Sequence, residues 1–309
     1  MRIICLGAGA IGGYFGGRLI EGGQPVTFLV RERRKRQLLS DGLRIKSQYG
    51  DFSSPVEAIM PDEIDGPADI VFLTCKAYDL EPAMEITGPA IGPDTAILPL
   101  LNGIAHMEIL NERFGKDRVL GGLAKIAATM DSLGQIVHLN DWRFIKFGEQ
   151  DGSDTERVRA LKAVFDRTSV IATATPDILH EMWSKVVHLS TVAGMTTLMR
   201  ASVGEIASTP DGTALFLDLL EKNAEIARRE GFAPTEEFLS EYRDLFHDTT
   251  STYTASMLRD IERHGPTEAD HIIGFMCRKA REHGLDDRFH RIIYTHLKAY
   301  EERRRAERF

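Results

Sequence analysis

The amino-acid sequence predicts an α/β fold, in which an N-terminal Rossmann-type, doubly wound domain precedes an all-helical C-terminal domain. Three observations predict this fold. A short apolar run at the N-terminus leads directly into a glycine-rich turn over residues 7–13. Strand-like apolar runs then alternate with helical segments up to about residue 172, which is typical of a parallel sheet covered by helices. From about residue 177 onward, the apolar residues follow helical spacing.

The first thirty residues have the pattern of a dinucleotide-binding unit: an apolar run over 2–6, the glycine turn, a helix-forming stretch, and a second apolar run over 26–30. In this pattern Gly7 permits the tight turn, Gly9 lets the backbone approach a pyrophosphate, and Gly12 lets the helix pack closely on the strand. The helix N-terminus presents free N–H groups to the phosphates. The alternative is a plain turn between a strand and a helix. The cofactor-binding residues expected here are Gly7, Ala8, Gly9, Ala10, Ile11 and Gly12.

The residue after the second strand indicates which nicotinamide cofactor to expect. NAD sites carry Asp or Glu at this point, to hold the ribose 2′-hydroxyl. Here Arg31 takes the position, and five of the six residues over 31–36 are cationic. A guanidinium can hold the 2′-phosphate of NADP through paired hydrogen bonds, whereas a carboxylate repels it. We therefore expect NADP, with Arg31 as the phosphate ligand. The alternative is a solvated basic helix start, with Glu32 as the acid of an NAD site.

Composition excludes several classes of protein. The net charge of −8 argues against general nucleic-acid binding. No apolar stretch reaches the roughly eighteen residues of a membrane span, and the N-terminal strand does not have the pattern of a signal peptide. Cys5, Cys75 and Cys277 lie far apart and lack metal-site spacing, so we expect reduced, buried thiols and no metal. These features favour a cytoplasmic protein that binds neither nucleic acid nor membrane; it could assemble as a homodimer.

The remaining elements follow from the same patterns. Strands are expected over 2–6, 26–30, 69–74, 95–100 and 118–123, followed by shorter, antiparallel additions near 125–131, 135–139, 143–148 and 169–172. Turn signals at 209–212, 231–234, 264–266 and 283–284 separate the helices of the second part. The charged tail over 301–308 has the pattern of a solvated helix end. We place an NADP-binding Rossmann domain at 1–174 and a helical substrate and catalytic domain at 175–309.

A Rossmann domain specifies no reaction, so the chemistry must come from polar residues at its edge and in the second domain. Lys76 and Asn102 each follow an expected strand, at the edge where doubly wound folds bind ligands. Lys185 lies early in the first helix of the second domain, and Ser256 lies further along. Glu268 is expected in the first turn of a helix, where a carboxylate is favoured, with the preceding threonine near the N-cap.

Each of these residues also has an ordinary structural interpretation. A lysine at a strand end is usually solvated, and an Asn-Gly pair usually makes a turn. A lysine on a helix can extend its side chain to solvent. Ser256 could face a neighbouring helix, and Glu268 could serve only at the helix start. The order and spacing of the residues favour a site over these separate explanations.

In that order and spacing, the chain resembles the ketopantoate reductases (2-dehydropantoate 2-reductases) essentially from end to end. The matching pieces are the GAGAIGG start, Arg31, residues 75–79, 102–103 and 183–185, and SMLRDIERHGPTEADHIIG over 256–274. The resemblance implies a Rossmann domain and a helical domain with the active site where they meet. It also implies NADPH-dependent reduction of the 2-keto acid ketopantoate to pantoate, a step toward pantothenate and coenzyme A.

The resemblance also implies a role for each residue. Lys185 matches the general acid that protonates the carbonyl oxygen, and an adjacent ammonium suits the alkoxide that hydride addition builds. Glu268 matches the carboxylate that contacts the substrate hydroxyl region and helps to hold the lysine. Ser256 matches a ligand of the substrate carboxylate. Asn102 matches a residue near the nicotinamide ribose and the substrate, and Lys76 matches a residue near the cofactor.

The chain departs from the family where the substrate binds. The family carries asparagines four and eight residues after the lysine, on the same helix face, but this chain has Leu189 and Ala193 there. Losing each polar partner costs roughly 1–3 kcal/mol of substrate binding. His188 and Ser190 project in other directions. Leu101 also stands where the family often has glutamine.

Three functions therefore stay open. The first is ketopantoate reduction. The second is reduction of another 2-keto acid, or a 3-hydroxyacyl-type reduction, in a more apolar pocket. The third is a cofactor-binding sensor without turnover. Retention of both Lys185 and Glu268 counts against the sensor, whereas Leu189 and Ala193 count against ketopantoate.

Overall fold

The computed structural model describes residues 1–308, which divide into two compact units. Unit 1 contains Met1–Leu101 and His106–Ile178, and unit 2 contains Asn102–Ala105 and the chain from Leu179 onward. The division after Ile178 differs from the boundary expected after residue 174. Residues beyond 174 still belong to the first unit because the Thr175 N–H donates to the Phe147 carbonyl at 3.0 Å and Ile178 is fully buried. Phe309, the last residue of the expected second domain, lies outside the described residues.

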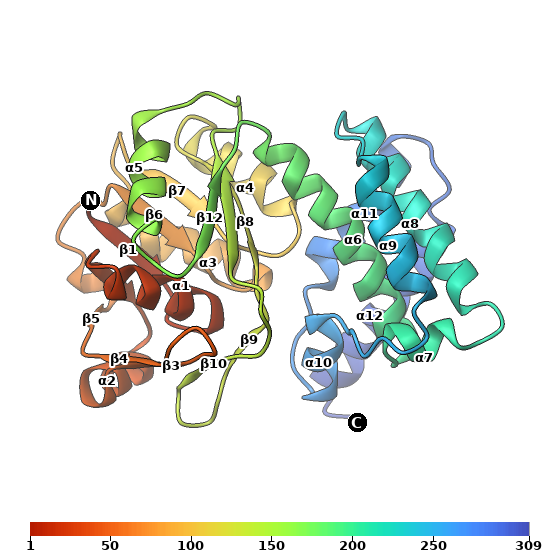
Figure 1. Cartoon of the computed structure of the whole chain (residues 1–309), viewed down its shortest axis with the longest axis horizontal. Coiled ribbons are helices and arrows are strands. Elements are labelled where there is room, and N and C mark those ends of the chain that lie inside the picture. Colours follow the sequence, from red (N-terminus) through yellow and green to blue (C-terminus); the bar gives the residue numbers. More distant parts are fainter. Residues whose placement is uncertain (309) are drawn as a thin grey trace. The chain divides into compact units, whose positions relative to one another are not determined.

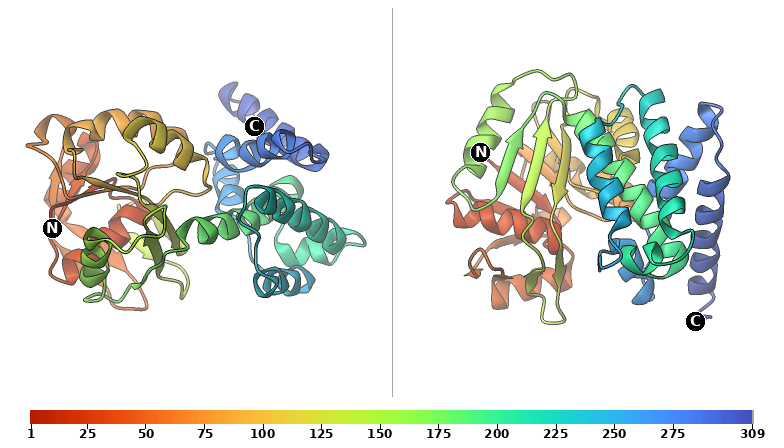
Figure 2. Two further views of the ribbon diagram at one scale, coloured as in Figure 1. Left: turned by 90° about the horizontal axis from the view of Figure 1, so that it is seen from above. Right: turned by 45° about the vertical axis from the view of Figure 1, so that its right-hand side comes forward.

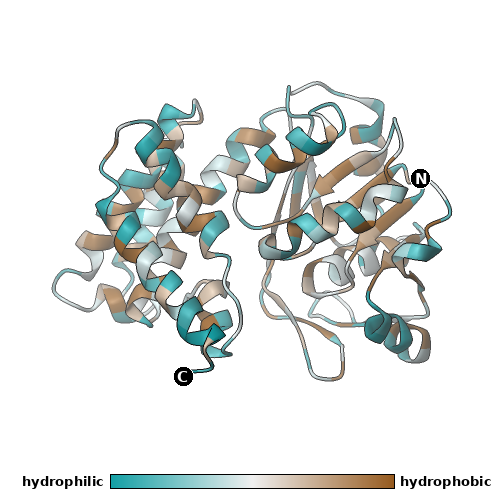
Figure 3. Ribbon diagram, turned by 180° about the vertical axis from the view of Figure 1, so that it is seen from behind, coloured by the Kyte–Doolittle hydropathy of each residue, from teal (hydrophilic) through white to brown (hydrophobic). Residues whose placement is uncertain are grey.

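Unit 1 is built on a five-stranded, all-parallel sheet with the order β5-β2-β1-β6-β7 (Figure 1). Its strands are β1 (Ile3–Leu6), β2 (Val26–Leu29), β5 (Glu57–Ile59), β6 (Ile70–Leu73) and β7 (Ala96–Pro99). All residues of β1, β6 and β7 are buried, and Figure 3 shows these strands as hydrophobic. The strand order is that of the Rossmann fold, with its topological switch point between β1 and β6. The predicted doubly wound fold is therefore confirmed.

Helices and short 3₁₀ turns lie between these strands and after the last of them. The helices of the first part of the chain are α1 (Ala10–Glu21), α2 (Glu32–Asp41), α3 (Leu80–Thr87), α4 (Ala105–Phe114) and α5 (Glu156–Phe165), and the 3₁₀ turns are η1 (Pro61–Glu63), η2 (Ala77–Asp79) and η3 (Gly88–Ala90). On α2 only Leu38 is buried, and the helix is largely hydrophilic in Figure 3. Its cationic residues therefore lie on a largely exposed helix.

Two smaller mixed sheets complete unit 1, with the orders β4-β3-β10-β9 and β12-β11-β8. Their strands are β3 (Leu43–Lys46), β4 (Phe52–Ser54), β8 (Gly121–Lys125), β9 (Ala128–Met130), β10 (Ile136–His138), β11 (Phe144–Gly148) and β12 (Ile171–Ala174). The sequence patterns did not predict β3, β4 and β5, which are short. The prediction that the later strands are all antiparallel is wrong, because β12 pairs parallel with β11 and β10 pairs parallel with β3. The strand expected over 118–123 begins at Gly121, and before it only Val119 bridges to Ile97.

All elements assigned from Ile178 to residue 308 are helical. They are α6 (Ile178–Met199), α7 (Val203–Ala207), α8 (Gly212–Arg229), α9 (Glu236–His247), α10 (Ser256–Glu262), the π-helical turn η4 (Asp270–Gly274), α11 (Phe275–Glu282) and α12 (Arg288–Arg305). Figure 2 shows the other helices packed around the second half of α6, where every residue from Ser190 to Thr197 is buried. The four predicted turn signals fall where helices end or begin. No helix of the described chain is long and apolar enough to cross a bilayer.

A buried polar chain joins three of these helices. Asn223 on α8 donates from Nδ2 to Thr191 Oγ1 on α6 at 2.9 Å, and its Oδ1 lies 2.8 Å from His290 Nε2 on α12. The three side chains are at most 1% exposed. Because Oδ1 of the amide can only accept, the imidazole donates from Nε2. These hydrogen bonds fix α6, which also carries Lys185, to α8 and α12.

Candidate functional site

The glycine turn has the geometry that its sequence predicts. Gly7 lies at a φ of +95°, and its N–H donates to the Leu29 carbonyl of β2 at 2.9 Å. A Cβ at Gly12 would lie 2.2 Å from the Gly7 carbonyl oxygen and 2.3 Å from Thr74 Oγ1, so only glycine allows α1 to lie this close to the sheet. Gly9 is the N-cap of α1, with open space where a Cβ would be. The first N–H groups of α1 have no partner within the helix and can bind an anion.

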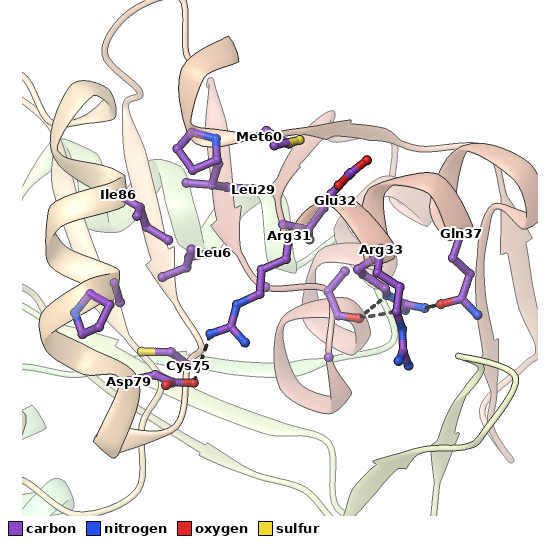
Figure 4. Close-up of a pocket in the computed structure, with 18 of the residues that line it drawn as sticks. Leu6, Leu29, Arg31, Glu32, Arg33, Gln37, Met60, Cys75, Asp79 and Ile86 are labelled. Carbon is purple, nitrogen blue, oxygen red and sulfur yellow. Dashed lines mark hydrogen bonds and ion pairs between the residues drawn. The ribbon is translucent and has the colours of Figure 1, made fainter.

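A cavity of about 770 Å³ lies beside this turn, within the range of small-ligand sites. Its walls come from the glycine turn, the end of β2, the start of α2, the segment after β6 and the first turns of α3 (Figure 4). Cys75 is one of the lining residues and is half-buried, so the prediction of a buried thiol is wrong for it. Cys5 and Cys277 are buried, as predicted. This cavity is where a dinucleotide would be expected from the sequence.

Arg31 lies at the mouth of this cavity. It is the N-cap of α2, its side chain is 88% exposed, and its Nη2 lies 3.6 Å from Oδ2 of Asp79 (Figure 4). Arg33 also lines the cavity and is exposed. Glu32 lines the cavity as well, but its carboxylate pairs with Arg36 at 3.2 Å. The exposed guanidinium groups are thus accessible to a cofactor phosphate.

Arg34 has a different role, which sequence reasoning missed. Its Nε and Nη2 donate to the Ala8 carbonyl of the glycine turn at 3.2 and 2.8 Å. Its Nη1 donates to the Gly134 carbonyl at 2.9 Å and to Gln37 Oε1 at 2.8 Å. Burial, with a further contribution from Arg44, lowers the pKa of Arg34. This arginine, which also lines the cavity, supports the glycine turn through the Ala8 carbonyl, and no local pattern distinguishes it from its cationic neighbours.

Lys76 follows β6 at the switch point of the sheet. It is half-buried and is the N-cap of η2. Thr74, two residues earlier, donates from Oγ1 to the Leu6 carbonyl at 2.7 Å and so ties the end of β6 to the end of β1. Lys76 is therefore at the sheet edge where it was predicted to be, although it is not among the residues that line the cavity.

The second group of predicted residues comes together within unit 2. Lys185 Nζ lies 3.4 Å from Oδ1 of Asn102, and Nδ2 of Asn102 lies 3.4 Å from Oε2 of Glu268. Both distances are at the long end for hydrogen bonds. Asn102 follows β7 in the chain, but its contacts place it in unit 2. We call Lys185, Asn102 and Glu268 the catalytic cluster.

Gly103 allows Asn102 to reach this cluster. Its φ is +83°, and a Cβ there would lie 2.9 Å from the backbone oxygen of His271 in η4. Any other residue would push the Asn102 segment away from η4 and thus from Glu268. The Asn-Gly pair therefore does make a turn, and this turn places Asn102 in the catalytic cluster.

Trp183 sets the direction of Lys185. Its indole is 4% exposed and packs on the rings of Phe232 at 6.1 Å and Phe275 at 5.7 Å. Side chains two residues apart on a helix point to nearly opposite sides, so the buried Trp183 directs Lys185 away from the aromatic packing. Phe275 begins α11, directly after η4, and this contact also links α6 to the segment that carries Glu268.

Glu268 is 3% exposed and lies directly before a helix. Helical backbone begins at Ala269, and the Glu268 carbonyl accepts the first helical bond from the Ile272 N–H at 3.1 Å. The prediction that Glu268 is in the first turn, after a capping Thr267, is therefore wrong by one residue. Thr267 is not the cap because its side chain bonds elsewhere, to Glu301. The π-helical turn that follows is a type of distortion often found at functional sites.

Ser256 does not join the catalytic cluster. It is the first residue of α10 and is half-buried, and no hydrogen bond among the described residues links it to the cluster. Of the two positions that depart from the family pattern, Leu189 is half-buried, whereas Ala193 is fully buried. His188 lies against the ring of Tyr242 at 4.1 Å, with its Nε2 3.4 Å from the Tyr253 hydroxyl. Leu189 is thus the one of the two with accessible surface.

Comparison with known proteins identifies the family of this chain. The model of the family "Ketopantoate reductase PanE/ApbA" matches residues 3–152, and that of its C-terminal domain matches residues 177–301. The chain is 37% identical over 304 residues to an uncharacterized oxidoreductase, YkpB, of Bacillus subtilis, covering 97% of this chain and 99% of that one. It is 27% identical to a 2-dehydropantoate 2-reductase of Archaeoglobus fulgidus, covering 97% and 98%. The crystal structure of a 2-dehydropantoate 2-reductase from Methylococcus capsulatus superposes with a TM-score of 0.88 at 26% identity, covering 98% of each chain.

Proposed function

The chain is an oxidoreductase of the ketopantoate reductase family, and we propose that it reduces ketopantoate to pantoate with NADPH, in the cytoplasm, as a step toward pantothenate and coenzyme A. The observation that carries this proposal is the catalytic cluster. It places an amine and a buried carboxylate on either side of one amide, which accepts from Lys185 and donates to Glu268. Such a cluster suits proton transfer to a carbonyl oxygen.

The reaction adds a hydride and a proton to the ketone. NADPH, when bound, supplies the hydride to the carbonyl carbon. Negative charge then develops on the carbonyl oxygen, where the Lys185 ammonium stabilises it and donates the proton that completes the product hydroxyl. Lys185 recovers a proton from solvent. Asn102 orients the ammonium through its Oδ1, while its Nδ2 engages Glu268.

The remaining roles follow from family membership. We assign Glu268 to the hydroxyl region of the substrate, Ser256 to its carboxylate, and Lys76 to the vicinity of the cofactor. For the cofactor we favour NADPH over NADH, because Arg31 and Arg33 both lie exposed along the cavity beside the glycine turn. Two guanidinium groups would hold the 2′-phosphate, while the ion pair with Arg36 occupies the competing carboxylate of Glu32.

Leu189 favours a second candidate function. It stands where the family binds substrate with an asparagine, one helical turn after Lys185, and it has accessible surface. An apolar side chain there would favour a 2-keto acid with a plain branched alkyl chain. The two candidates use the same cofactor and the same proton donor, so only the substrate separates them.

A matched pair of substrates tests the proposal. Ketopantoate and 3,3-dimethyl-2-oxobutanoate differ by a single hydroxyl group, and NADPH oxidation by the purified protein is measured with each. A site that binds the hydroxyl should favour ketopantoate by about ten-fold or more in kcat/KM. Leu189→Asn should then raise this ratio further, by roughly two- to ten-fold for one regained hydrogen bond.

The other outcomes separate the alternatives. A ratio of the two kcat/KM values near one, or a preference for the alkyl substrate, would favour the second candidate function over ketopantoate reduction. No oxidation of NADPH with any 2-keto acid, together with tight cofactor binding, would indicate a sensor without turnover. Ala193→Asn is not a useful companion variant, because it would bury an amide in the core of α6.

A further inference from the structure

The segment that carries Glu268 is held by the C-terminal helix. Before Glu268, the Thr267 N–H and Oγ1 both donate to Oε1 of Glu301 on α12, at 2.7 and 2.8 Å. One helix position earlier, the Tyr300 hydroxyl donates to the Gly265 carbonyl at 2.8 Å. These bonds are made to a stretch, residues 265–268, that has no regular secondary structure of its own.

The same helix holds the chain after Glu268. The Asp270 carboxylate accepts from the Tyr294 hydroxyl at 2.5 Å and from Lys298 Nζ at 2.9 and 3.0 Å. Glu268 is thus flanked on both sides by bonds to α12, at positions one and two residues away. These bonds restrict the movement of its backbone relative to α12.

Glu301 differs from its neighbours at the helix end. It is 6% exposed, whereas sequence reasoning expected residues 301–308 to be solvated. That prediction is wrong for Glu301, because Thr267 and Arg304, the latter at 3.0 Å, bond its two oxygens. Burial raises its pKa, but these hydrogen bonds and the charge of Arg304 outweigh burial, so the pKa of Glu301 is below its usual value. A buried carboxylate is costly unless fully bonded, and the proposed reaction makes no direct use of this one.

We propose that Glu301 is a positioning residue of the reductase site: it acts through Thr267 to hold Glu268 beside Asn102, and so α12 sets the geometry of the catalytic cluster. This inference rests on the proposed function only for its kinetic consequence. Displacing a catalytic group by about 1 Å can cost up to a hundred-fold in rate. Loss of the Glu301 carboxylate should therefore lower turnover although Glu301 lies outside the cluster.

The chain offers a matched control one residue away. Glu302 is exposed on the same helix and pairs with Arg305 at 2.6 Å. Glu301→Ala and Glu302→Ala each remove one carboxylate from the same helical turn, but only the first removes a bond to the Glu268 segment. Glu301→Gln keeps an oxygen that can accept from Thr267. We expect Glu301→Ala to lower kcat about ten- to a hundred-fold, Glu301→Gln to recover most of the loss, and Glu302→Ala to match wild type.

Two further readouts separate positioning from a general loss of stability. In a Glu268→Gln background, Glu301→Ala should lower kcat no further, because its effect passes through Glu268. The affinity for NADPH, measured by titration, should not change in any of these variants. An equal loss of kcat in both backgrounds would overturn the proposal.

Hydrogen exchange tests, without any turnover, whether Glu301 holds the segment that carries Glu268. The amides of residues 267–270 should exchange faster in Glu301→Ala than in wild type or Glu302→Ala. Unchanged exchange in this segment would overturn the proposal. If Glu301→Ala does not fold, Thr267→Val provides the same comparison, since it removes the Oγ1 bond and keeps the N–H bond. Absence of turnover in wild type would refute the proposed function, while the exchange result would still decide whether Glu301 holds this segment.

Discussion

The cofactor cavity and the catalytic cluster place their charges in opposite ways. At the cavity, Arg31 is 88% exposed and extends from the start of a helix on which one residue is buried. In the cluster, Glu268 is 3% exposed, Asn102 reaches it through the turn at Gly103, and the neighbouring Thr267 is bonded to Glu301. An exposed binding side chain can be substituted with little effect on its surroundings, whereas substitution of a buried side chain also affects the residues that pack against it. Variants of the first should change binding alone, and variants of the second should affect chemistry or stability.

The largest effect is expected at the cluster. Lys185→Ala should lower kcat by roughly 10²–10⁴, the usual contribution of a positioned proton donor. Steady-state kinetics with the preferred 2-keto acid measure it. NADPH affinity should not change, because Lys185 and the cofactor cavity belong to different units. Turnover at the wild-type rate would show that another group donates the proton.

A second prediction concerns the stability of the helical unit. Burial, with a further contribution from Lys222, lowers the pKa of His290 to about 4, against the contributions of Asp287, Asp286 and Asp218. Its Nδ1 has no hydrogen-bond partner among the described residues, so protonation would bury an unpaired donor. The unfolded chain binds this proton at about pH 6.5. Stability is therefore full above pH 6.5 and falls as the pH drops from about 6.5 to 4.

The expected loss is on the order of 3 kcal/mol in the free energy of unfolding across this range. Urea unfolding of wild type and His290→Gln at several pH values measures it. His138, His271 and His296 also have lowered pKa values, and they contribute to the pH dependence of stability in both proteins. The effect of His290 is therefore the difference between the two proteins in the slope of the free energy of unfolding against pH. Parallel curves for the two proteins would exclude His290 as the cause.

The smallest effects are expected at the cofactor cavity, where two arginines three residues apart can be compared. Arg31→Ala should weaken NADPH binding by about 1.5–3 kcal/mol, roughly ten- to a hundred-fold, and leave NADH binding nearly unchanged. Arg34→Ala should weaken the binding of both cofactors, by about 1–3 kcal/mol, because it leaves the Ala8 carbonyl without its donor. The glycine turn that contains Ala8 would bind the pyrophosphate that both cofactors share.

Titration of each variant with both cofactors, followed by fluorescence, distinguishes these roles. If Arg31→Ala lost equal affinity for NADPH and NADH, Arg31 would not be the ligand of the 2′-phosphate. A loss confined to NADPH in Arg34→Ala would mean that this arginine reaches the phosphate instead of supporting the turn.

The sequence by itself determined the features whose physics is local. A tight turn at Gly7, a close approach at Gly12 and a cation at Arg31 all belong to one strand–turn–helix–strand unit, so their spacing along the chain specifies their spacing in space. Helical periodicity likewise predicted the all-helical second part. Lys185, Asn102 and Glu268 could be named as candidates from the resemblance, which also implied that Glu268 helps to hold Lys185, but their spacing along the chain did not predict the contacts of Asn102 with both.

Tertiary structure alone decided how these candidates meet. Asn102 lies 83 residues from Lys185 and 166 from Glu268 along the chain, and their contacts arise from packing between distant segments. The same holds for Arg34, which local sequence does not distinguish from Arg31, and for Glu301, which a charged helix end would leave in solvent. Burial and long-range hydrogen bonds depend on what the rest of the chain brings alongside a residue, and neither periodicity nor motif spacing contains that information.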